Sequence, residues 1–340
     1  MSATIKDIQR ETGLSLSTIS KYINGGTVRE KNKIKLDQAI KKLNFKANHF
    51  AQGLRTNRSS TIGVLLPDLD TPFFSSIISH MENDFRDSGY GMIVSSCYGS
   101  PEFGQEALSF LISKRIDGLI VFPPSVDSKF IQMCTDENIP VVLLDQIVKD
   151  YETDAVVINN RTVSKEMTEE CIRLGHKHIG LIIGSTSGSF TMRKRYDGYA
   201  DALAAANIPF DPNLVAASIH VSISDGYNGF KKIISAAPYC TVIYCTNYDT
   251  TLGALFAIND LGYTVGKDIS LCGFDGMDLV NVVKPRLTVV NQPIREMASK
   301  AASLLINKIA AGSAQDAYSI ITLQAEICRG DSIRDLRDSS

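Results

Sequence analysis

The strongest constraint on this chain is an alternation, from residue 61 onward, of short apolar runs with longer stretches whose apolar residues recur at helical spacing. Apolar runs of four or five residues between turn signals are typical of parallel strands that are buried on both faces. Strands that alternate with helices in this way predict βαβ units. The expected strands are 62–66, 92–96, 118–122, 141–145, 156–159, 179–183, 216–219, 242–245 and 271–274, with helices near 72–88, 102–113 and 128–138.

The alternation forms two similar series, which predict two doubly wound lobes, each with a parallel sheet. Ligands bind such sheets beyond the carboxyl ends of the strands. Side chains at or just beyond the carboxyl end of an expected strand are therefore candidate ligand contacts. They are residues 68–74, Asp145, Asn159, residues 185–195, Asn247, Tyr248, Phe274 and Asp275.

The composition is that of an ordinary globular protein. Over 340 residues, 44% are hydrophobic and 21% are charged, which excludes wholesale disorder and a fibrous repeat. Residues 1–30 contain no apolar core of a signal peptide, and no stretch approaches about 18 apolar residues, so we expect a cytoplasmic protein without membrane contact. The seven cysteines are scattered without a C-x-x-C pair, which predicts reduced core residues.

The formal net charge of −2 hides an asymmetry along the chain. The first 60 residues carry 12 Lys and Arg against 4 Asp and Glu, whereas the remaining 280 carry 23 against 33. A basic head on an acidic body indicates a polyanionic partner for the head. A basic face that is merely solvated has the same composition.

The head has the pattern of three short helices, at 4–12, 16–23 and about 30–43. Gly13 and the residues after it form a tight turn between the first two helices, and Ser15 is the expected N-cap of the second. Two helices joined by a tight glycine turn and supported by a third predict a small all-α helix-turn-helix domain.

The second helix has one packing face and one free face. Ile19, Tyr22 and Ile23 share the packing face. Short hydroxyl side chains and a lysine amine on the other face can approach phosphates and base edges, which suits a DNA major groove. A three-helix module for protein interactions would show the same packing. The free face carries Ser17, Thr18, Ser20, Lys21 and Asn24.

These residues resemble the LacI/GalR family of bacterial transcription regulators. The matching stretches are TIKDI at 4–8, TGLS at 12–15, STISK at 17–21, YING at 22–25 and NHFAQGLRT at 48–56. The resemblance implies double-stranded operator DNA as a partner. It implies that Leu16, Ser17 and Lys21 take base-reading positions and that Thr18, Ser20 and Asn24 contact or position the DNA backbone. Thr4 is a further implied DNA-binding residue.

Three positions depart from the family pattern. Lys21 stands where the family usually has arginine, and lysine cannot make the same planar two-pronged contact with a base. Gln9 replaces a small alanine where two helices approach each other. Ala47 replaces the proline that commonly precedes the hinge, so the chain is less restrained there.

Residues 48–54 are expected to form a conditional helix. Asn48 can cap it, but seven residues fall well short of the ~12–15 that an isolated helix needs in water. In the resembled family, paired hinges enter the minor groove; Asn48, Ala51 and Leu54 take the contact positions here, with Leu54 as the wedge between base pairs. Alternatively, Phe50 and Leu54 anchor a linker on the core.

The resemblance extends over nearly the whole chain. The matching stretches in the body are GVLLPD at 63–68, TPFF at 71–74, DGLI at 117–120, LGHKHI at 174–179, RYDGY at 195–199, GFD at 273–275 and PRLTV at 285–289. The implied fold is periplasmic-binding-protein-like, with two lobes joined by three crossovers. The expected boundaries are 1–47 for the head, 48–59 for hinge and linker, 60–160 with 292–322 for the N-terminal lobe, 161–291 with 323–332 for the C-terminal lobe, and 333–340 for a polar tail.

The same resemblance implies an effector between the lobes. Carboxylates and a guanidinium can hold vicinal hydroxyls, and an aromatic ring can cover a sugar face, so the expected effector is a carbohydrate. Tyr248 stands where the family commonly has aspartate. Alternatively, Arg195 pairs structurally with Asp197 or another carboxylate, and the phenylalanines belong to the core. The implied contacts are Phe73, Phe74, Asp145, Arg195, Asn247, Tyr248 and Asp275.

Enzymatic motifs are weak in this sequence. GSTSG at 184–188 lacks the G-x-S-x-G order of a nucleophile elbow, and the segment 262–268 is one residue too short for a phosphate loop. His176 and His178 have no cysteine or carboxylate at metal-ligand spacing. We therefore expect no enzyme, no cofactor and no metal.

The sequence as a whole predicts a homodimeric repressor that reads a palindromic operator and senses a small molecule. Two alternatives remain open at this point. One is a sugar receptor without a transcriptional role, and the other is a regulator of this family that is controlled by a phosphorylated protein.

Overall fold

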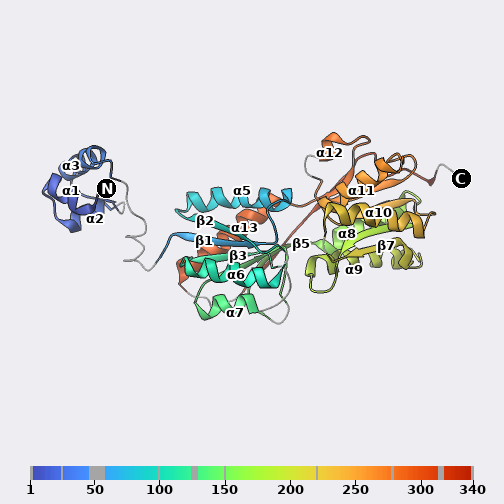
Figure 1. The fold of residues 1–340 in the computed structure, drawn as a ribbon, viewed down its shortest axis with the longest axis horizontal. Helices are drawn as coiled ribbons and strands as arrows, with labels where there is room; N and C mark the ends of the chain where they lie inside the picture. The colour runs from blue at the N-terminus through green and yellow to red at the C-terminus, as the bar shows by residue number, and fades with distance from the viewer. Residues whose placement is uncertain are drawn as a thin grey trace. The chain divides into compact units, whose positions relative to one another are not determined.

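The computed structural model divides the chain into two compact units, Met1–Ser59 and Ser60–Ser340 (Figure 1). The structure describes residues 3–23, 26–45, 58–98, 100–123, 129–148, 151–219, 221–276, 279–312 and 318–337. The predicted hinge at 48–54 lies outside the described residues.

The first unit is the predicted three-helix domain. Its helices are α1 Ile5–Thr12, α2 Leu16–Ile23 and α3 Glu30–Lys42. One or two apolar side chains from each helix meet in its core, which consists of Ile8, Ile19, Leu36 and Ala39. The lysines of α3 are exposed as predicted, which leaves their charge available to a partner.

Local sequence determines where α1 and α2 begin and end. Thr4 and Asp7 form a capping box at the start of α1, with the backbone N–H of Thr4 donating to Asp7 Oδ2 at 2.8 Å. Gly13 ends α1 with a φ of 67°, a left-handed conformation that only glycine adopts without steric cost. Ser15 Oγ accepts from the backbone N–H of Thr18 at 3.3 Å, which confirms the predicted N-cap of α2.

The second unit begins with a lobe built on a parallel sheet, in the strand order β11-β5-β4-β3-β1-β2. Helix α13 packs against α5 and against the strands at the centre of this sheet. The bounds in this lobe are β1 Thr61–Leu66, α5 Pro72–Asp87, β2 Gly91–Ser96, α6 Pro101–Ser113, β3 Gly118–Val121, α7 Lys129–Asp136, β4 Val141–Leu144, β5 Asp154–Ile158, α13 Ile294–Ala311 and β11 Ile320–Leu323.

The other lobe repeats this design with the order β12-β10-β9-β8-β6-β7, in which only β12 is antiparallel to its neighbour. The two sheets therefore have equivalent positions, and β4 corresponds to β9. The bounds are α8 Asn160–Arg173, β6 Ile179–Gly184, α9 Phe190–Ala205, the 3₁₀ turn Pro212–Leu214, β7 Val215–Ser218, α10 Ile223–Ala236, β8 Val242–Cys245, α11 Tyr248–Asp260, β9 Ser270–Phe274, α12 Leu279–Val282, β10 Thr288–Asn291 and β12 Glu326–Cys328.

The chain passes between the lobes three times, after β5, after β10 and between β11 and β12. Asn159 ties the first of these crossovers to the third. Its Oδ1 accepts from the backbone N–H of Ala325 at 2.8 Å, and its Nδ2 donates to Gln324 Oε1 at 2.8 Å. The first and third crossovers are therefore connected through Asn159.

The central strands of both sheets are buried throughout, as their apolar sequences predicted. Burial of each Val, Leu or Ile side chain there contributes roughly 1.5–3 kcal/mol to stability. Strands β10, β11 and β12 were not predicted. Each has only three or four residues, and β11 is largely exposed, so neither length nor alternation marks them in the sequence.

The segment after β12 packs on the second lobe. Ile333 is buried, the backbone N–H of Arg334 donates to Ser270 Oγ at 2.9 Å, and that of Leu336 donates to the carbonyl of Leu174 at 2.8 Å. The part of the expected polar tail that the structure describes, 333–337, is therefore attached to the lobe.

All seven cysteines are free thiols; six are buried and Cys328 is half-buried. Burial raises the pKa of the Cys134 and Cys240 thiols to about 12, so neither forms a reactive thiolate near neutral pH. Within the described ranges, the helices are too short or too polar to cross a bilayer.

Candidate functional site

The exposed face of α2 presents the predicted base-reading residues together. Leu16 is 43% exposed at the first position of the helix, and Ser17 and Lys21 are exposed on the same element. Ile19 points the opposite way and is fully buried in the head core. An exposed leucine on a small polar domain is an apolar surface available to a partner.

The hydroxyl groups at the start of α2 form a small network. Ser15 Oγ lies 2.9 Å from Ser17 Oγ and 2.9 Å from Thr18 Oγ1, so these side chains hold each other at the helix N-terminus. Thr18 and Ser20 are half-buried. The N-terminus of a helix attracts phosphate, so this network lies where a DNA backbone contact is physically favoured.

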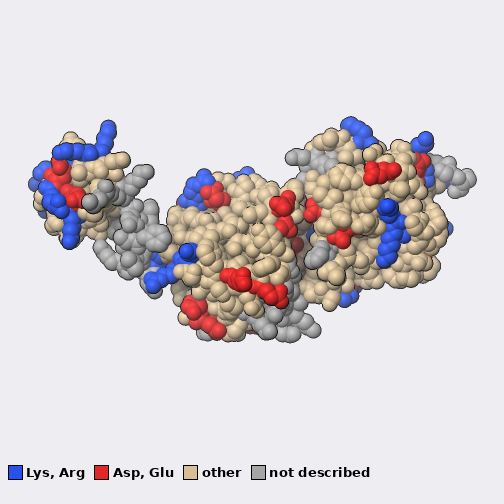
Figure 2. All heavy atoms as spheres, in the orientation of Figure 1, with Lys and Arg blue, Asp and Glu red and all other residues tan. Residues whose placement is uncertain are grey.

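Two cross-links hold α2 and α1 against α3. The Tyr22 hydroxyl donates to Asp37, and Lys42 Nζ lies 2.7 Å from Glu11 Oε1. Figure 2 shows Lys and Arg side chains over much of the visible face of this unit. Three further predicted DNA contacts, Asn48, Ala51 and Leu54, lie outside the described residues, as does Asn24.

In the two-lobed unit, Asp145 and Asp275 occupy equivalent positions. Each directly follows a strand, β4 or β9, and each has a left-handed backbone, with φ of 64° and 58°. The backbone N–H of Asp145 donates to Val156 at 2.9 Å, and that of Asp275 donates to Val290 at 2.8 Å, so the neighbouring strand fixes both. Left-handed non-glycine residues are strained and concentrate at functional sites.

Arg195 of α9 is 2% exposed, and its positive charge lowers the pKa of both aspartates. Its Nε donates to Asn160 Oδ1 at 2.8 Å, and Nη1 donates to the carbonyl of Thr246. The guanidinium lies over the Phe274 ring, 3.5 Å from the ring centroid. These contacts hold a buried cation in one orientation.

A close approach of α8 and α9 makes the contact between Arg195 and Asn160 possible. Gly198 lies one turn after Arg195, and a Cβ there would come within 2.2 Å of the carbonyl oxygen of Arg161. Only glycine permits this helix spacing. The RYDGY stretch thus carries both the cation and the residue that lets it reach its partner.

Burial raises the pKa of both aspartates. The pKa of Asp145 rises to about 7, mainly because its carboxyl group is buried, while the Arg195 charge opposes the rise and the Asp275 charge adds to it. The pKa of Asp275 is also raised by burial and lowered by Arg195 and by a hydrogen bond from Gln292. Among the described residues no carboxylate lies within ion-pair distance of Arg195, so the alternative pairing with Asp197 is not formed.

Three buried polar atoms around this cluster lack a hydrogen-bond partner in the structure. They are Asp145 Oδ1, Asn160 Nδ2 and Gln292 Oε1. The other amide atom of each residue is hydrogen-bonded. Asn160 Oδ1 accepts from Arg195 Nε at 2.8 Å, and Gln292 Nε2 donates to Asp275 Oδ1 at 2.8 Å. A buried polar atom without a partner is costly, so these atoms mark where a ligand would compensate. Sequence reasoning missed both amides. Asn160 is the first residue of α8, just after the first crossover, and Gln292 follows β10, a strand that the sequence did not predict.

Other predicted effector contacts have structural partners. Phe73 is buried in the core, 5.3 Å from the ring of Phe74, which packs edge-on against Phe122. Asn247 caps α11, because its Oδ1 accepts from the backbone N–H of Thr250 at 3.1 Å. Tyr248 is half-buried at the first position of that helix.

The lobes contact each other directly beside the cluster. Gln146 Oε1 accepts from the backbone N–H of Phe190 at 2.9 Å, and its Nε2 donates to Ser189 Oγ at 3.3 Å. Thr71 Oγ1 donates to Asp249 Oδ2 at 3.2 Å. Behind these contacts between the lobes, Arg195 and Asp275 are buried, whereas Asp145 is half-buried.

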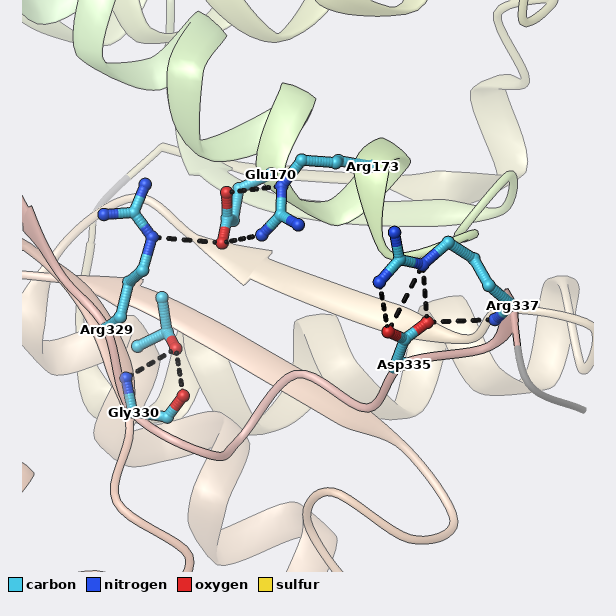
Figure 3. A network of polar contacts seen from close by, with 7 residues as sticks. Glu170, Arg173, Arg329, Gly330, Asp335 and Arg337 are labelled. Carbon is cyan, nitrogen blue, oxygen red and sulfur yellow. Dashed lines mark hydrogen bonds and ion pairs between the residues drawn. The ribbon is translucent and has the colours of Figure 1, made fainter.

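Two surface grooves, with volumes of about 520 and 400 Å³, lie elsewhere, on the second lobe. They share an exposed network in which Arg173 and Arg329 both bind Glu170, close to Asp335 and its partner Arg337 (Figure 3). None of the cluster residues lines either groove. Because these charges are already paired and exposed, the grooves are less suited to a specific ligand than the buried cluster.

Two family models match this chain. The model described as "Bacterial regulatory proteins, lacI family" matches residues 4–48, and the model "Periplasmic binding proteins and sugar binding domain of LacI family" matches residues 59–329. The chain belongs to the LacI family. It is a transcription regulator with an N-terminal DNA-binding domain and a two-lobed ligand-binding core.

Known LacI-family proteins align over nearly their full lengths. The HTH-type transcriptional regulator RegA of Clostridium saccharobutylicum is 31% identical over 90% of this chain and 92% of its own. The structure of transcription regulator CcpA of Lactococcus lactis is 27% identical, covers 80% of this chain and 98% of its own, and has a TM-score of 0.73. The lac repressor dimer bound to operator and the anti-inducer ONPF is 22% identical, covers 98% and 100%, and shares the fold with a TM-score of 0.85.

In this LacI-family chain, His176 and Ser185 hydrogen-bond to neighbouring protein groups. His176 is buried, with Nδ1 2.8 Å from Thr241 Oγ1 and Nε2 2.9 Å from the carbonyl of Arg334. Ser185 Oγ accepts from the backbone N–H of Ser187 at 3.3 Å, as expected of a loop. The described part of the chain contains no group of three or more metal-ligating side chains.

Proposed function

We propose that this chain is a cytoplasmic transcriptional repressor that binds a palindromic operator as a homodimer and is controlled by a carbohydrate effector between its lobes. The observation that carries the effector site is the cluster of Asp145, Arg195 and Asp275. Arg195 and Asp275 are buried, Oδ1 of the half-buried Asp145 is shielded from solvent, and polar atoms in and around the cluster lack partners. The match of residues 59–329 to a sugar-binding domain supports a carbohydrate. The protein then acts by binding and requires no cofactor.

In this proposal α2 lies in the major groove. Its exposed Leu16, Ser17 and Lys21 contact base edges, because they lie on the face opposite the head core. Thr4, Thr18 and Ser20 contact or position the phosphate backbone together with Asn24. The hinge residues Asn48, Ala51 and Leu54 enter the minor groove, with Leu54 as the wedge.

The linker after the expected hinge ends at Ser60, which hydrogen bonds attach to the first lobe. The backbone N–H of Ser60 donates to Asp117 Oδ2 at 2.7 Å, and its carbonyl accepts from Gly91 at 2.9 Å. Any rotation of this lobe therefore moves the end of the hinge. An effector that changes the angle between the lobes shifts the paired hinges between folded and unfolded, and a coupling of about 1–3 kcal/mol changes operator affinity about 5- to 150-fold.

The proposal is tested by separating the two activities. The Asp275→Ala variant should keep operator affinity and lose the response to a sugar that shifts the thermal unfolding of the wild-type protein. The matched control is Asp201→Ala, an exposed aspartate of α9 that pairs with Arg161 outside the cluster. A retained response in Asp275→Ala would remove this residue from the site. If no sugar shifts the unfolding of the wild-type protein while a phosphorylated protein changes operator affinity, the proposed effector class is wrong.

A further inference from the structure

The cleft between the lobes holds more negative than positive charge. Arg195 is the buried cation, and two aspartates flank it, one from each lobe. A further carboxylate, Asp249 at the start of α11, contributes to the field at Asp275. Figure 2 shows acidic side chains on both lobes at their junction on the visible face.

The outer part of the cleft is acidic as well. The Thr71 hydroxyl lies 3.1 Å from Asp68 Oδ1 and 3.2 Å from Asp249 Oδ2, which brings carboxylates of the two lobes close together. Burial raises the pKa of Asp249, the hydrogen bond from Thr71 opposes this rise, and the charges of Asp68 and Asp70 add to it. Two other cations precede Arg195 in α9. Lys194 lies over the Phe190 ring, 5.5 Å from its centroid, and Arg193 is exposed.

Without a ligand, and with both aspartates ionised, the cluster of Asp145, Arg195 and Asp275 carries one more negative charge than positive charge. One guanidinium cannot balance two buried carboxylates, and a buried charge without a partner is strongly destabilising. A proton on Asp145 resolves this in the absence of ligand, in agreement with the raised pKa of that group. A ligand cation beside Asp145 could replace this proton, because Asp145 Oδ1 has no partner.

The two amide atoms without a partner, Asn160 Nδ2 and Gln292 Oε1, indicate which polar groups the rest of the ligand carries. Asn160 Oδ1 must accept from Arg195, which leaves Asn160 Nδ2 as a donor for a ligand oxygen. Gln292 Nε2 must donate to Asp275, which leaves Gln292 Oε1 as an acceptor for a ligand hydroxyl. A hydroxyl group can serve both as acceptor and as donor, so neighbouring hydroxyls on one frame satisfy both amides.

We infer that the effector is a polyol that bears an ammonium group, such as an amino sugar, with the ammonium held by Asp145 and Asp275 and hydroxyls held by Asn160 and Gln292. This inference rests on the proposed function, because it assigns the effector to the same cleft. It excludes phosphorylated sugars, since a phosphate would add negative charge to a buried site that already has a surplus.

The test compares matched sugars on the full-length protein. Glucose, galactose and mannose are each titrated as the neutral sugar, the 2-amino sugar and the 6-phosphate, at up to about 20 mM and pH 7.5, by calorimetry and thermal shift. At least one amino sugar should bind at least about tenfold more tightly than its neutral counterpart, and no phosphate should bind. A neutral sugar or a phosphate that binds as tightly as its amino counterpart overturns the inference, as does the absence of binding by all three amino sugars.

Proton release provides a second readout. At pH 6, an amino sugar that replaces the proton on Asp145 should release most of one proton, measured by calorimetry in buffers of different ionisation enthalpy. The Asp145→Asn variant should lose both the proton release and the preference for the amino sugar. If a neutral sugar binds without preference, and Arg195→Lys abolishes this binding, only the ligand charge is wrong. If no sugar of any kind binds while operator binding persists, the proposed carbohydrate effector is wrong as well.

Discussion

Replacement of Asp145 by asparagine should stabilise the protein at alkaline pH. The pKa of Asp145 is raised from 3.8 to about 7 by burial, so the folded state holds a proton that the unfolded state has released across this range. Each pKa unit corresponds to about 1.36 kcal/mol, so the wild-type protein loses about 4 kcal/mol between these values as the pH rises. Of this loss, about 2 kcal/mol falls between pH 5.5 and pH 8.5. Asparagine is nearly isosteric with the protonated acid and does not titrate.

Urea unfolding at pH 5.5 and pH 8.5, followed by circular dichroism because the chain has no tryptophan, measures this difference. The Asp145→Asn variant should gain about 2 kcal/mol relative to the wild type between the two pH values. In the control Asp201→Asn, the pKa is lowered by Arg161, so its contribution is lost only as the pH falls towards the folded-state pKa. This control should give no pH-dependent difference over the same range. If the free energy of unfolding changes equally with pH in the wild type and in Asp145→Asn, the Asp145 carboxyl group is not buried and protonated as proposed.

Three further predictions concern the head and hinge. Lys21→Ala should weaken operator binding by about 1–3 kcal/mol and relax the preference at one base pair, measured by anisotropy on a set of operator variants; equal weakening on every sequence would make Lys21 a phosphate contact. Ile19→Ala should destabilise the head by about 2–5 kcal/mol, because Ile19 is fully buried; retained DNA binding at 37 °C would contradict this. Leu54→Ala should reduce operator bending in a gel assay with permuted sites, and unchanged bending would exclude the wedge.

The sequence predicts those parts of the fold that local pattern encodes. The nine expected strands and the three head helices are present. Apolar runs of four or five residues, a glycine at a left-handed position and a serine cap are all visible in a short window of sequence. Strands β10 to β12 form because partner strands are in place, and their own three or four residues carry no pattern.

The cluster was predictable only in part. Asp145 and Asp275 follow strands, and such positions are known ligand contacts. Asn160 and Gln292 are ordinary amides in the sequence, and only the fold brings them to Arg195 and Asp275. Asn247 follows a strand too, but the helix that begins after it uses this side chain as its cap.

The most direct test of the account is selection of duplex fragments from a random library by the purified full-length protein, at near-physiological salt, with and without the Lys21→Ala change. A sequence-specific repressor that reads bases through Lys21 should enrich a palindrome, and the half-sites of this palindrome should change when Lys21 is replaced. Recovery of fragments without a common sequence, with affinity set by salt alone, would contradict a sequence-specific regulator.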